Sequence, residues 1–240
     1  MQDNTYKIYD ENGVIYEKYL IVANEIGSNK NVIELGCYDG SFCCFLRQKG
    51  NFVTGVESDA VAFKSAQTKC DLAYKIDLNN PEELIRLLQD KKFQYVLSLD
   101  VLEHLIDPGK LLNGLKKYCV DMDCYLLVTL PNIAFWGIRK NLLLGNFEYN
   151  NVGILDKTHL KFYTYHSAVR LFETAGYRIL EWKPVSYMAP LLGRMGLRNQ
   201  LLRSFTTKVE RYLAFRFPNF FCSQIYFKLV PTPTFKKSRF

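Results

Sequence analysis

Short apolar runs alternate with amphipathic segments along most of the chain. In residues 13–26 apolar side chains recur at helical spacing, and Gly27 follows as a stop signal. Further along, short apolar runs indicate buried strands, and the segments between them carry apolar residues on one face only. The expected strands are 32–35, 52–56, 73–76, 95–99 and 125–130, and the expected helices are 41–48, 59–69, 81–89 and 108–118.

This strict alternation of strand and helix favours an α/β fold, in which helices cover both faces of a parallel sheet. Beyond Pro131 the pattern is less regular. The elements expected there are a helix at 132–145, an ordered loop at 146–162, a helix from Thr164 to Gly176, and strands at 177–182 and 222–229. Because there is no internal repeat or low-complexity linker, we expect one domain over residues 1–240, with a helical segment at 1–29 and a helical insertion at 186–220.

The composition is that of a soluble globular protein. Hydrophobic residues make up 48% of the chain and charged residues 23%, which excludes disordered and fibrous classes. No apolar run is long enough to span a bilayer, and the first residues lack a signal-peptide pattern, so we expect a cytoplasmic protein. Seven cysteines without a CxxC pair indicate reduced, buried thiols and give no sign of a zinc site.

Positive charge is concentrated in the last quarter of the chain. The net charge is +7, and from Glu181 onward eleven Lys or Arg stand against two Glu. Residues 188–217 look like an amphipathic basic helix. Such a helix is either a lid with a solvated basic face, or a contact for a phosphate-bearing or lipid-linked acceptor or an anionic membrane surface. We expect no nucleic-acid partner, because the aromatic residues are not clustered with the basic ones.

The segment VIELGCYDGSF, at the turn after the first strand, is the main candidate for ligand binding. Gly36 and Gly40 lie in this turn, where the lack of a side chain would let a ligand approach the backbone. Dinucleotide sites need G-x-G-x-x-G, whereas this turn has only G-x-x-x-G, preceded by Glu34. A carboxylate disfavours a pyrophosphate there. It suits S-adenosylmethionine, which carries an ammonium group and a sulfonium and no phosphate.

Two further acidic residues end the next two expected strands. Glu57 could accept hydrogen bonds from both hydroxyls of a ribose, and Asp77 from the amino group of an adenine. Because parallel strands end at the same edge of a sheet, Glu34, Glu57 and Asp77 are expected to share one site.

These segments resemble the class I S-adenosylmethionine-dependent methyltransferases. ELGCYDG resembles their first motif with Tyr38 in place of the middle glycine, VTGVESD their ribose-binding strand, IDL their adenine segment, and YVLSLDVLEHLIDP their fourth motif. The resemblance implies a Rossmann-like, three-layer αβα fold with seven strands, mostly parallel and with an antiparallel last strand, plus a helical insertion before that strand. The cofactor-binding residues that it implies are Glu34, Gly36, Cys37, Gly40, Glu57, Ser58, Asp77, Leu78 and Asp100.

Residues 130–164 resemble bacterial methyltransferases associated with glycan or surface-polysaccharide assembly. By this resemblance, residues 131–164 cover the acceptor site. The acceptor is then expected to be a sugar or another small metabolite, methylated on a hydroxyl oxygen. Two alternatives remain open: a non-catalytic partner that keeps the cofactor site, and an NAD(P)-dependent reductase, which the missing glycine and Glu34 disfavour. We predict no particular oligomeric state.

Two of the three histidines are candidates for the catalytic base. His104 follows the fourth strand, and His159 lies in the segment expected to cover the acceptor; either could instead have a structural role. His166 is expected to be a surface residue. Asp100, Glu103 and His104 also resemble the residues of ubiquinone-type O-methyltransferases, for which a divalent ion is implied, so a metal at this place is left open.

Overall fold

The computed structural model of the chain describes residues 8, 13, 15–89, 91–187 and 200–232. The helices are α1 (Glu17–Ile26), α2 (Ser41–Gln48), α3 (Ala60–Lys69), α4 (Glu82–Gln89), the 3₁₀ helix η1 (Leu102–His104), α5 (Pro108–Met122), α6 (Trp136–Leu143), α7 (Tyr165–Thr174), α8 (Gln200–Arg216) and α9 (Pro218–Phe221). The strands are β1 (Asn31–Leu35), β2 (Phe52–Glu57), β3 (Leu72–Lys75), β4 (Tyr95–Leu99), β5 (Tyr125–Pro131), β6 (Tyr177–Tyr187) and β7 (Cys222–Pro231).

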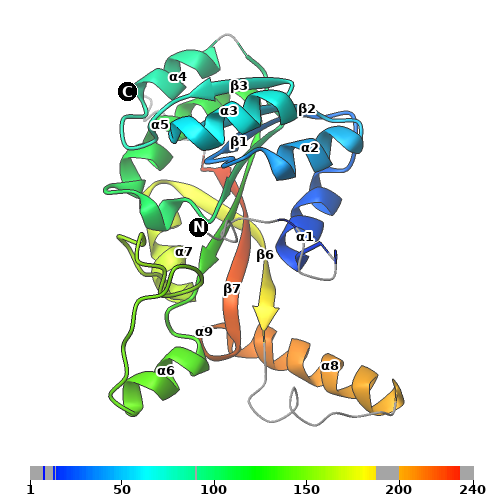
Figure 1. Cartoon of the computed structure of the whole chain (residues 1–240), viewed down its shortest axis with the longest axis vertical. Helices are drawn as coiled ribbons and strands as arrows, with labels where there is room; N and C mark the ends of the chain where they lie inside the picture. The colour runs from blue at the N-terminus through cyan, green and yellow to red at the C-terminus, as the bar shows by residue number, and fades with distance from the viewer. Residues whose placement is uncertain (1–7, 9–12, 14, 90, 188–199, 233–240) are drawn as a thin grey trace, which may run out of the picture.

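One seven-stranded sheet runs through the molecule in the order β3-β2-β1-β4-β5-β7-β6 (Figure 1). Strands β1 to β5 pair in parallel, and β7 pairs antiparallel with both β5 and β6. The mostly parallel sheet with an antiparallel last strand is therefore confirmed. The strand order reverses between β1 and β4, and ligands of open α/β sheets bind at such a point, outside the carboxyl ends of the strands.

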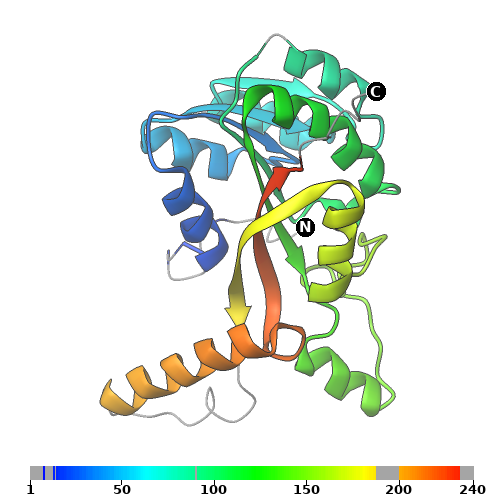
Figure 2. The same cartoon turned by 180° about the vertical axis from the view of Figure 1, so that it is seen from behind.

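Two apolar cores lie on opposite faces of this sheet. Neighbouring residues of β1 point to opposite sides, so Val32 belongs to one core and Ile33 to the other. Helices α1, α2 and α3 cover the first face, and α4, α5 and α7 cover the second (Figures 1 and 2). This is the three-layer αβα arrangement expected from the sequence.

Capping side chains start several helices where the sequence indicates. Asp59 Oδ1 accepts hydrogen bonds from the amides of Val61 and Ala62 at the start of α3, and Thr164 forms a capping box with Ser167 at the start of α7. Several boundaries differ from the prediction. Helix α1 begins at Glu17, α5 continues to Met122, and α6 is shorter than 132–145. Strand β6 continues to Tyr187 because β7 pairs with it along that length.

Helices α6 and α8 extend from the end of the molecule beyond β6 and β7 (Figures 1 and 2). Part of the basic segment expected at 188–217, residues 188–199, lies outside the described residues. Among the described helices, none has the length and apolar character needed to cross a bilayer. All seven cysteines are free thiols.

Candidate active site

A cavity of about 290 Å³ opens at the carboxyl ends of β1, β2 and β4, next to the segment after β3. It brings together eight of the nine residues expected to bind a cofactor: Glu34, Gly36, Cys37, Glu57, Ser58, Asp77, Leu78 and Asp100. Gly40 is not among the residues that line the cavity. The remaining lining comes mainly from α1, η1 and the β1–α2 loop.

The two glycines of this loop are needed for packing within the protein. A Cβ on Gly36 would lie 2.7 Å from Cγ2 of Val101, and one on Gly40 would lie 2.9 Å from the Cα of Ala66 in α3. Both glycines also have positive φ, +68° and +77°, which disfavours any side chain. Gly40 therefore lets α2 approach α3, and only Gly36 lies at the cavity.

Tyr38 replaces the middle glycine of the motif and keeps the backbone conformation that favours glycine. Its φ is +49°, in the left-handed region. The Tyr38 amide donates a hydrogen bond of 2.8 Å to Oε2 of Glu57, which ties the loop to the end of β2. The residue lines the first cavity.

We expect the Tyr38→Gly variant to be more stable than Tyr38→Ala by about 1 kcal/mol or more. Both variants delete the side chain, but only alanine retains the cost of the left-handed conformation. Denaturant unfolding of the two variants measures the difference. Tyr212, exposed in the interior of helix α8, provides the matched control, where alanine should be the more stable of the same two substitutions. A Tyr38→Ala variant as stable as Tyr38→Gly would show that the left-handed backbone conformation at residue 38 is not strained.

Backbone amides fix the carboxylate of Glu57 at the tip of β2. Oε2 accepts from Tyr38, and Oε1 accepts from the amides of Ser58 and Asp59 at 2.7 and 2.8 Å. Asp77 is held in a similar way, since its Oδ1 accepts from the amide of Asn79 at 2.9 Å. Two oriented acceptor groups thus lie at the ends of neighbouring strands, as the sequence predicts.

Glu34 differs from these carboxylates because it is buried. It is 5% exposed, and Sγ of Cys43 donates to its Oε2 over 3.0 Å. Burial raises the pKa of Glu34 to about 8. The protonated form of Glu34 is therefore favoured at neutral pH, and a nearby cation would favour the ionised form. The negative charge that the sequence suggests for Glu34 therefore depends on a cation nearby.

Asp100 is an ionised carboxylate held by three neighbours. It accepts from Lys18 Nζ at 2.5 Å, Thr129 Oγ1 at 2.8 Å and Gln224 Nε2 at 2.5 Å. Burial by itself would raise the pKa of Asp100, but the Lys18 ammonium and these hydrogen bonds hold it below its usual value. Lys18 and Gln224 were missed in the sequence, because a single Lys in a helix or Gln in a strand carries no motif.

A second cavity, of about 480 Å³, adjoins the first. Lys18, Tyr19, Asp100 and His104 line both cavities. The second one is also lined by Glu103, by His159 and its neighbours between β5 and α7, and by Gln224 of β7. A ligand in one cavity therefore lies next to a ligand in the other.

Hydrogen bonds assign the neutral tautomer of His104. Its Nδ1 lies 3.2 Å from the carbonyl oxygen of Thr158 and 3.1 Å from the Thr158 hydroxyl. That hydroxyl donates its own proton to Oδ1 of Asp156 at 2.6 Å, and a carbonyl can only accept. Nδ1 of His104 therefore carries a proton, and in the neutral ring this leaves the lone pair on Nε2.

His159 has the same tautomer and lies beside His104. Its Nδ1 is 3.0 Å from the carbonyl oxygen of Ile154, so its Nε2 also carries the lone pair. The two rings meet edge to face with centroids 4.8 Å apart. Burial lowers the pKa of His159, and the neighbouring His104 lowers it further, so the neutral form is favoured. His166, in contrast, is exposed, as expected.

Glu103 is a buried carboxyl group without a hydrogen-bond partner among the described residues. It is 0% exposed, and its Oε1 lies 4.0 Å from Nε2 of His159. Burial raises its pKa well above the usual value, and the charge of Asp100 adds to this. Donor atoms of Glu103, His104 and His159 lie within 4.8 Å of one another, so these three could hold a cation. Asp100, which the sequence grouped with them, is instead paired with Lys18.

Comparisons with known proteins identify the family of the chain. A family described as "Methyltransferase domain" matches residues 13–181. A 97-residue stretch is 29% identical to the O-antigen chain terminator bifunctional methyltransferase/kinase WbdD of Escherichia coli; it covers 39% of this chain and 14% of that protein.

The fold is similar to that of solved methyltransferases. The first is a SAM-dependent methyltransferase from Archaeoglobus fulgidus, with a TM-score of 0.57 and 19% identity over 89% of this chain and 94% of the other. The second is magnesium protoporphyrin IX methyltransferase from Synechocystis PCC 6803 with bound SAH, with a TM-score of 0.55 and 15% identity over 89% and 79%. The chain belongs to the methyltransferase domain family, and its resemblance to class I S-adenosylmethionine-dependent methyltransferases is thereby confirmed.

Proposed function

We propose that the protein transfers a methyl group from S-adenosylmethionine to a hydroxyl oxygen of a sugar or another small metabolite. The observation that carries this proposal is the pair of Nε2 lone pairs, on His104 and His159, at a cavity adjoining the expected cofactor site. Two neutral imidazoles are suited to take a proton from a hydroxyl group.

The chemistry of the first cavity fits S-adenosylmethionine. Among the described residues that line it, Lys18 is the only Lys or Arg, and Asp100 neutralises it. A pyrophosphate would thus find no free cation, which disfavours an NAD(P)-dependent reductase. Glu57 would accept hydrogen bonds from the ribose hydroxyls, and Asp77 would accept one from the adenine amino group. Glu34 would bind the ammonium group, and Gly36 would let the backbone of the β1–α2 loop approach the cofactor. When bound, this cofactor supplies a methyl group activated on a sulfonium.

The protein's own contribution is to position the acceptor, exclude water and remove a proton. Nε2 of His104 or His159 accepts the hydroxyl proton, while Nδ1–H stays fixed by a backbone carbonyl. The Glu103 carboxyl, which has no partner among the described residues, can hydrogen-bond the same hydroxyl group.

Residues 131–164 would cover the acceptor. The amides of Leu160 and Lys161 anchor this segment by donating to the Glu103 carbonyl at 2.8 and 2.9 Å. A requirement for added Mg²⁺ or Mn²⁺ would contradict the proposed role of His104 and His159 as bases, because the metal would occupy both Nε2 atoms.

Turnover should be lost on acidification with a midpoint below about 6.5, the ordinary pKa of histidine. The charged and titratable groups around His159 are Glu103, His104, Asp156 and Asp100, and their combined effect with burial lowers its pKa. Since only the neutral imidazole can accept a proton, activity is full above that pKa and falls as pH drops through it. The pH dependence of kcat measures the midpoint, and a midpoint above 7 would contradict a base with a lowered pKa.

A saccharide acceptor is supported by the local likeness to the O-antigen chain terminator methyltransferase/kinase. The direct experiment is transfer of labelled methyl groups to free sugars, sugar phosphates and lipid-linked sugars. Labelled product with one of these supports the proposal. A protein that binds the cofactor and labels no hydroxyl acceptor would instead support the alternative of a non-catalytic partner.

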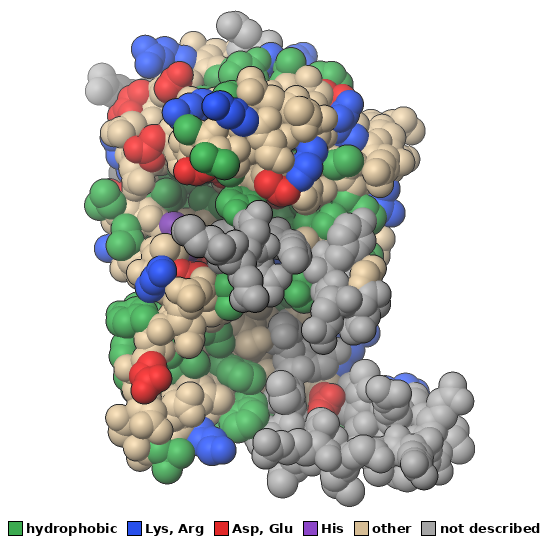
Figure 3. Space-filling model, viewed as in Figure 1, with side chains coloured by type: hydrophobic (Ala, Val, Ile, Leu, Met, Phe, Trp, Pro, Cys, Tyr) green, Lys and Arg blue, Asp and Glu red, His purple; other side chains and the backbone are tan. Residues whose placement is uncertain are grey.

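We further propose that the acceptor is presented at a membrane surface. Helix α6 and the residues after it expose Leu142, Leu143, Leu144 and Phe147, and hydrophobic side chains gather over this part of the molecule (Figure 3). The described part of α8 adds Lys208, Arg211 and Arg216 with the exposed ring of Tyr212 at the same end. Apolar and basic side chains together favour anionic lipid.

This membrane contact predicts binding to vesicles that contain anionic lipid, and much weaker binding to neutral vesicles. The attraction should weaken with salt, because it depends partly on charge. Cosedimentation with the two kinds of vesicle measures it. Equal recovery with both, or none with either, would contradict the contact.

A further inference from the structure

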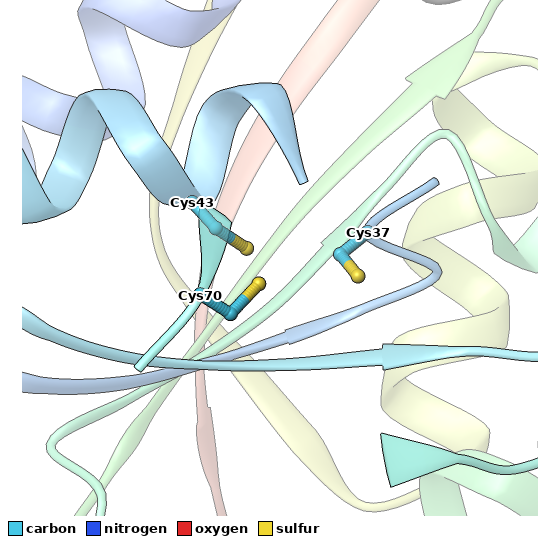
Figure 4. Close-up of side chains that lie close together, drawn as sticks. All are labelled: Cys37, Cys43 and Cys70. Carbon is cyan, nitrogen blue, oxygen red and sulfur yellow. The ribbon is translucent and has the colours of Figure 1, made fainter. Parts of the chain in front are cut away.

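Three buried thiols gather at the β1–α2 loop. Cys37 lies in the loop, Cys43 on α2 and Cys70 directly after α3, and none of them is more than 6% exposed. Their sulfur atoms all lie within 4.8 Å of one another. In Figure 4 the sulfur atoms of Cys43 and Cys70 point toward each other, with that of Cys37 beside them.

The surrounding backbone leaves room for these sulfur atoms. Gly55 lies in the middle of β2, where glycine weakens a strand and needs a reason. A Cβ at this position would lie 2.7 Å from Sγ of Cys37 and 2.7 Å from Sγ of Cys70. Any other residue at 55 would therefore push two of the three thiols out of place.

The donor atoms of the cluster suit a soft cation. Sulfur is the ligand that thiophilic metals prefer. Oε2 of the buried Glu34 lies 3.0 Å from Sγ of Cys43 and adds an oxygen donor beside the three sulfur atoms. Cys37 also lines the first cavity, which gives a cation a path inward.

We propose that Cys37, Cys43 and Cys70 bind a thiophilic divalent cation such as Zn²⁺. With Zn–S bonds of about 2.3 Å, the sulfur atoms of a tetrahedral site lie about 3.8 Å apart, so they need to close by about 1 Å at most. Each of the three thiols loses its proton to solvent as its sulfur–metal bond forms, and no oxidant or reductant is required. The site ties the β1–α2 loop, α2 and the end of α3 together.

Co²⁺ is the probe for this site, because thiolate-bound Co²⁺ in tetrahedral geometry has intense charge-transfer and visible absorption. The reduced, metal-free full-length chain is expected to bind one Co²⁺ with these bands, and Zn²⁺ should abolish them by displacement. Co²⁺ binding should weaken by more than about 100-fold in each of the variants Cys37→Ser, Cys43→Ser and Cys70→Ser. Loss of a residue that only hydrogen-bonds a metal ligand typically costs up to about 100-fold, so a larger effect indicates a direct ligand. Cys44→Ser is the matched control, since Cys44 is a half-exposed neighbour on the same helix, and it should keep the bands.

Two results would overturn the site. One is a wild-type chain that shows no thiolate–Co²⁺ absorption although all its thiols are reduced. The other is full absorption in any folded variant of the three cysteines. Thermal unfolding identifies a variant that fails to fold, and the other two variants then decide the question.

Discussion

Replacing both His104 and His159 by glutamine is expected to lower kcat by about 10²- to 10⁴-fold, the range that general base catalysis contributes. The reason is that His104 and His159 have the same tautomer. Each Nδ1 is engaged with a backbone carbonyl, so each ring presents a basic Nε2 to the second cavity. Glutamine can replace part of the hydrogen bonding but cannot accept a proton at neutral pH. Single variants identify which ring takes the proton, because that one should lose most of the activity.

The matched control is His166→Gln, at an exposed histidine outside both cavities, which should keep full turnover. Cofactor affinity should be nearly unchanged in His159→Gln, because His159 lines only the second cavity. If turnover is found and neither substitution slows it, the proposed base roles are wrong.

Replacing Glu57 by alanine is expected to weaken cofactor binding by about 1–3 kcal/mol, the scale of lost hydrogen bonds to a charged group. This corresponds to about a 5- to 150-fold higher Kd. The carboxylate already accepts from three amides around the cavity, so its position is fixed before a ribose arrives. Isothermal titration calorimetry with S-adenosylhomocysteine measures the change.

Asp59→Asn separates this effect from a general loss of negative charge. Asp59 is two residues away and caps α3, and asparagine caps a helix about as well. We therefore expect the Asp59→Asn variant to bind with nearly wild-type affinity. Equal affinity of Glu57→Ala and the wild type would mean that the ribose lies elsewhere.

The sequence predicts the cofactor side of the site because strand ends are predictable. Glu34, Glu57, Asp77 and Asp100 each lie at or just after the end of an apolar run, and parallel strands bring such ends to one edge. Gly40 differs from these residues, because it does not line the first cavity. Its sequence position suggests ligand contact, whereas its missing Cβ makes room for Ala66 of α3.

Contacts between distant segments could not be predicted from the sequence. Asp100 meets Lys18 and Gln224, which are 82 and 124 residues away and belong to no motif. Cys37, Cys43 and Cys70 lack the spacing of known metal motifs, and only the packing of α2 and α3 on the sheet brings them together. The His104 and His159 tautomers likewise depend on where the backbone carbonyls of residues 154 and 158 lie.

The proposed function depends on an adenosine site for a sulfonium cofactor that carries no phosphate. Calorimetric titration of the purified chain with S-adenosylhomocysteine and, separately, with NADH tests it most directly. We predict saturable, one-to-one binding of S-adenosylhomocysteine, and much weaker or no binding of NADH. No binding of S-adenosylhomocysteine at millimolar concentration, or tighter binding of NADH, would contradict the account.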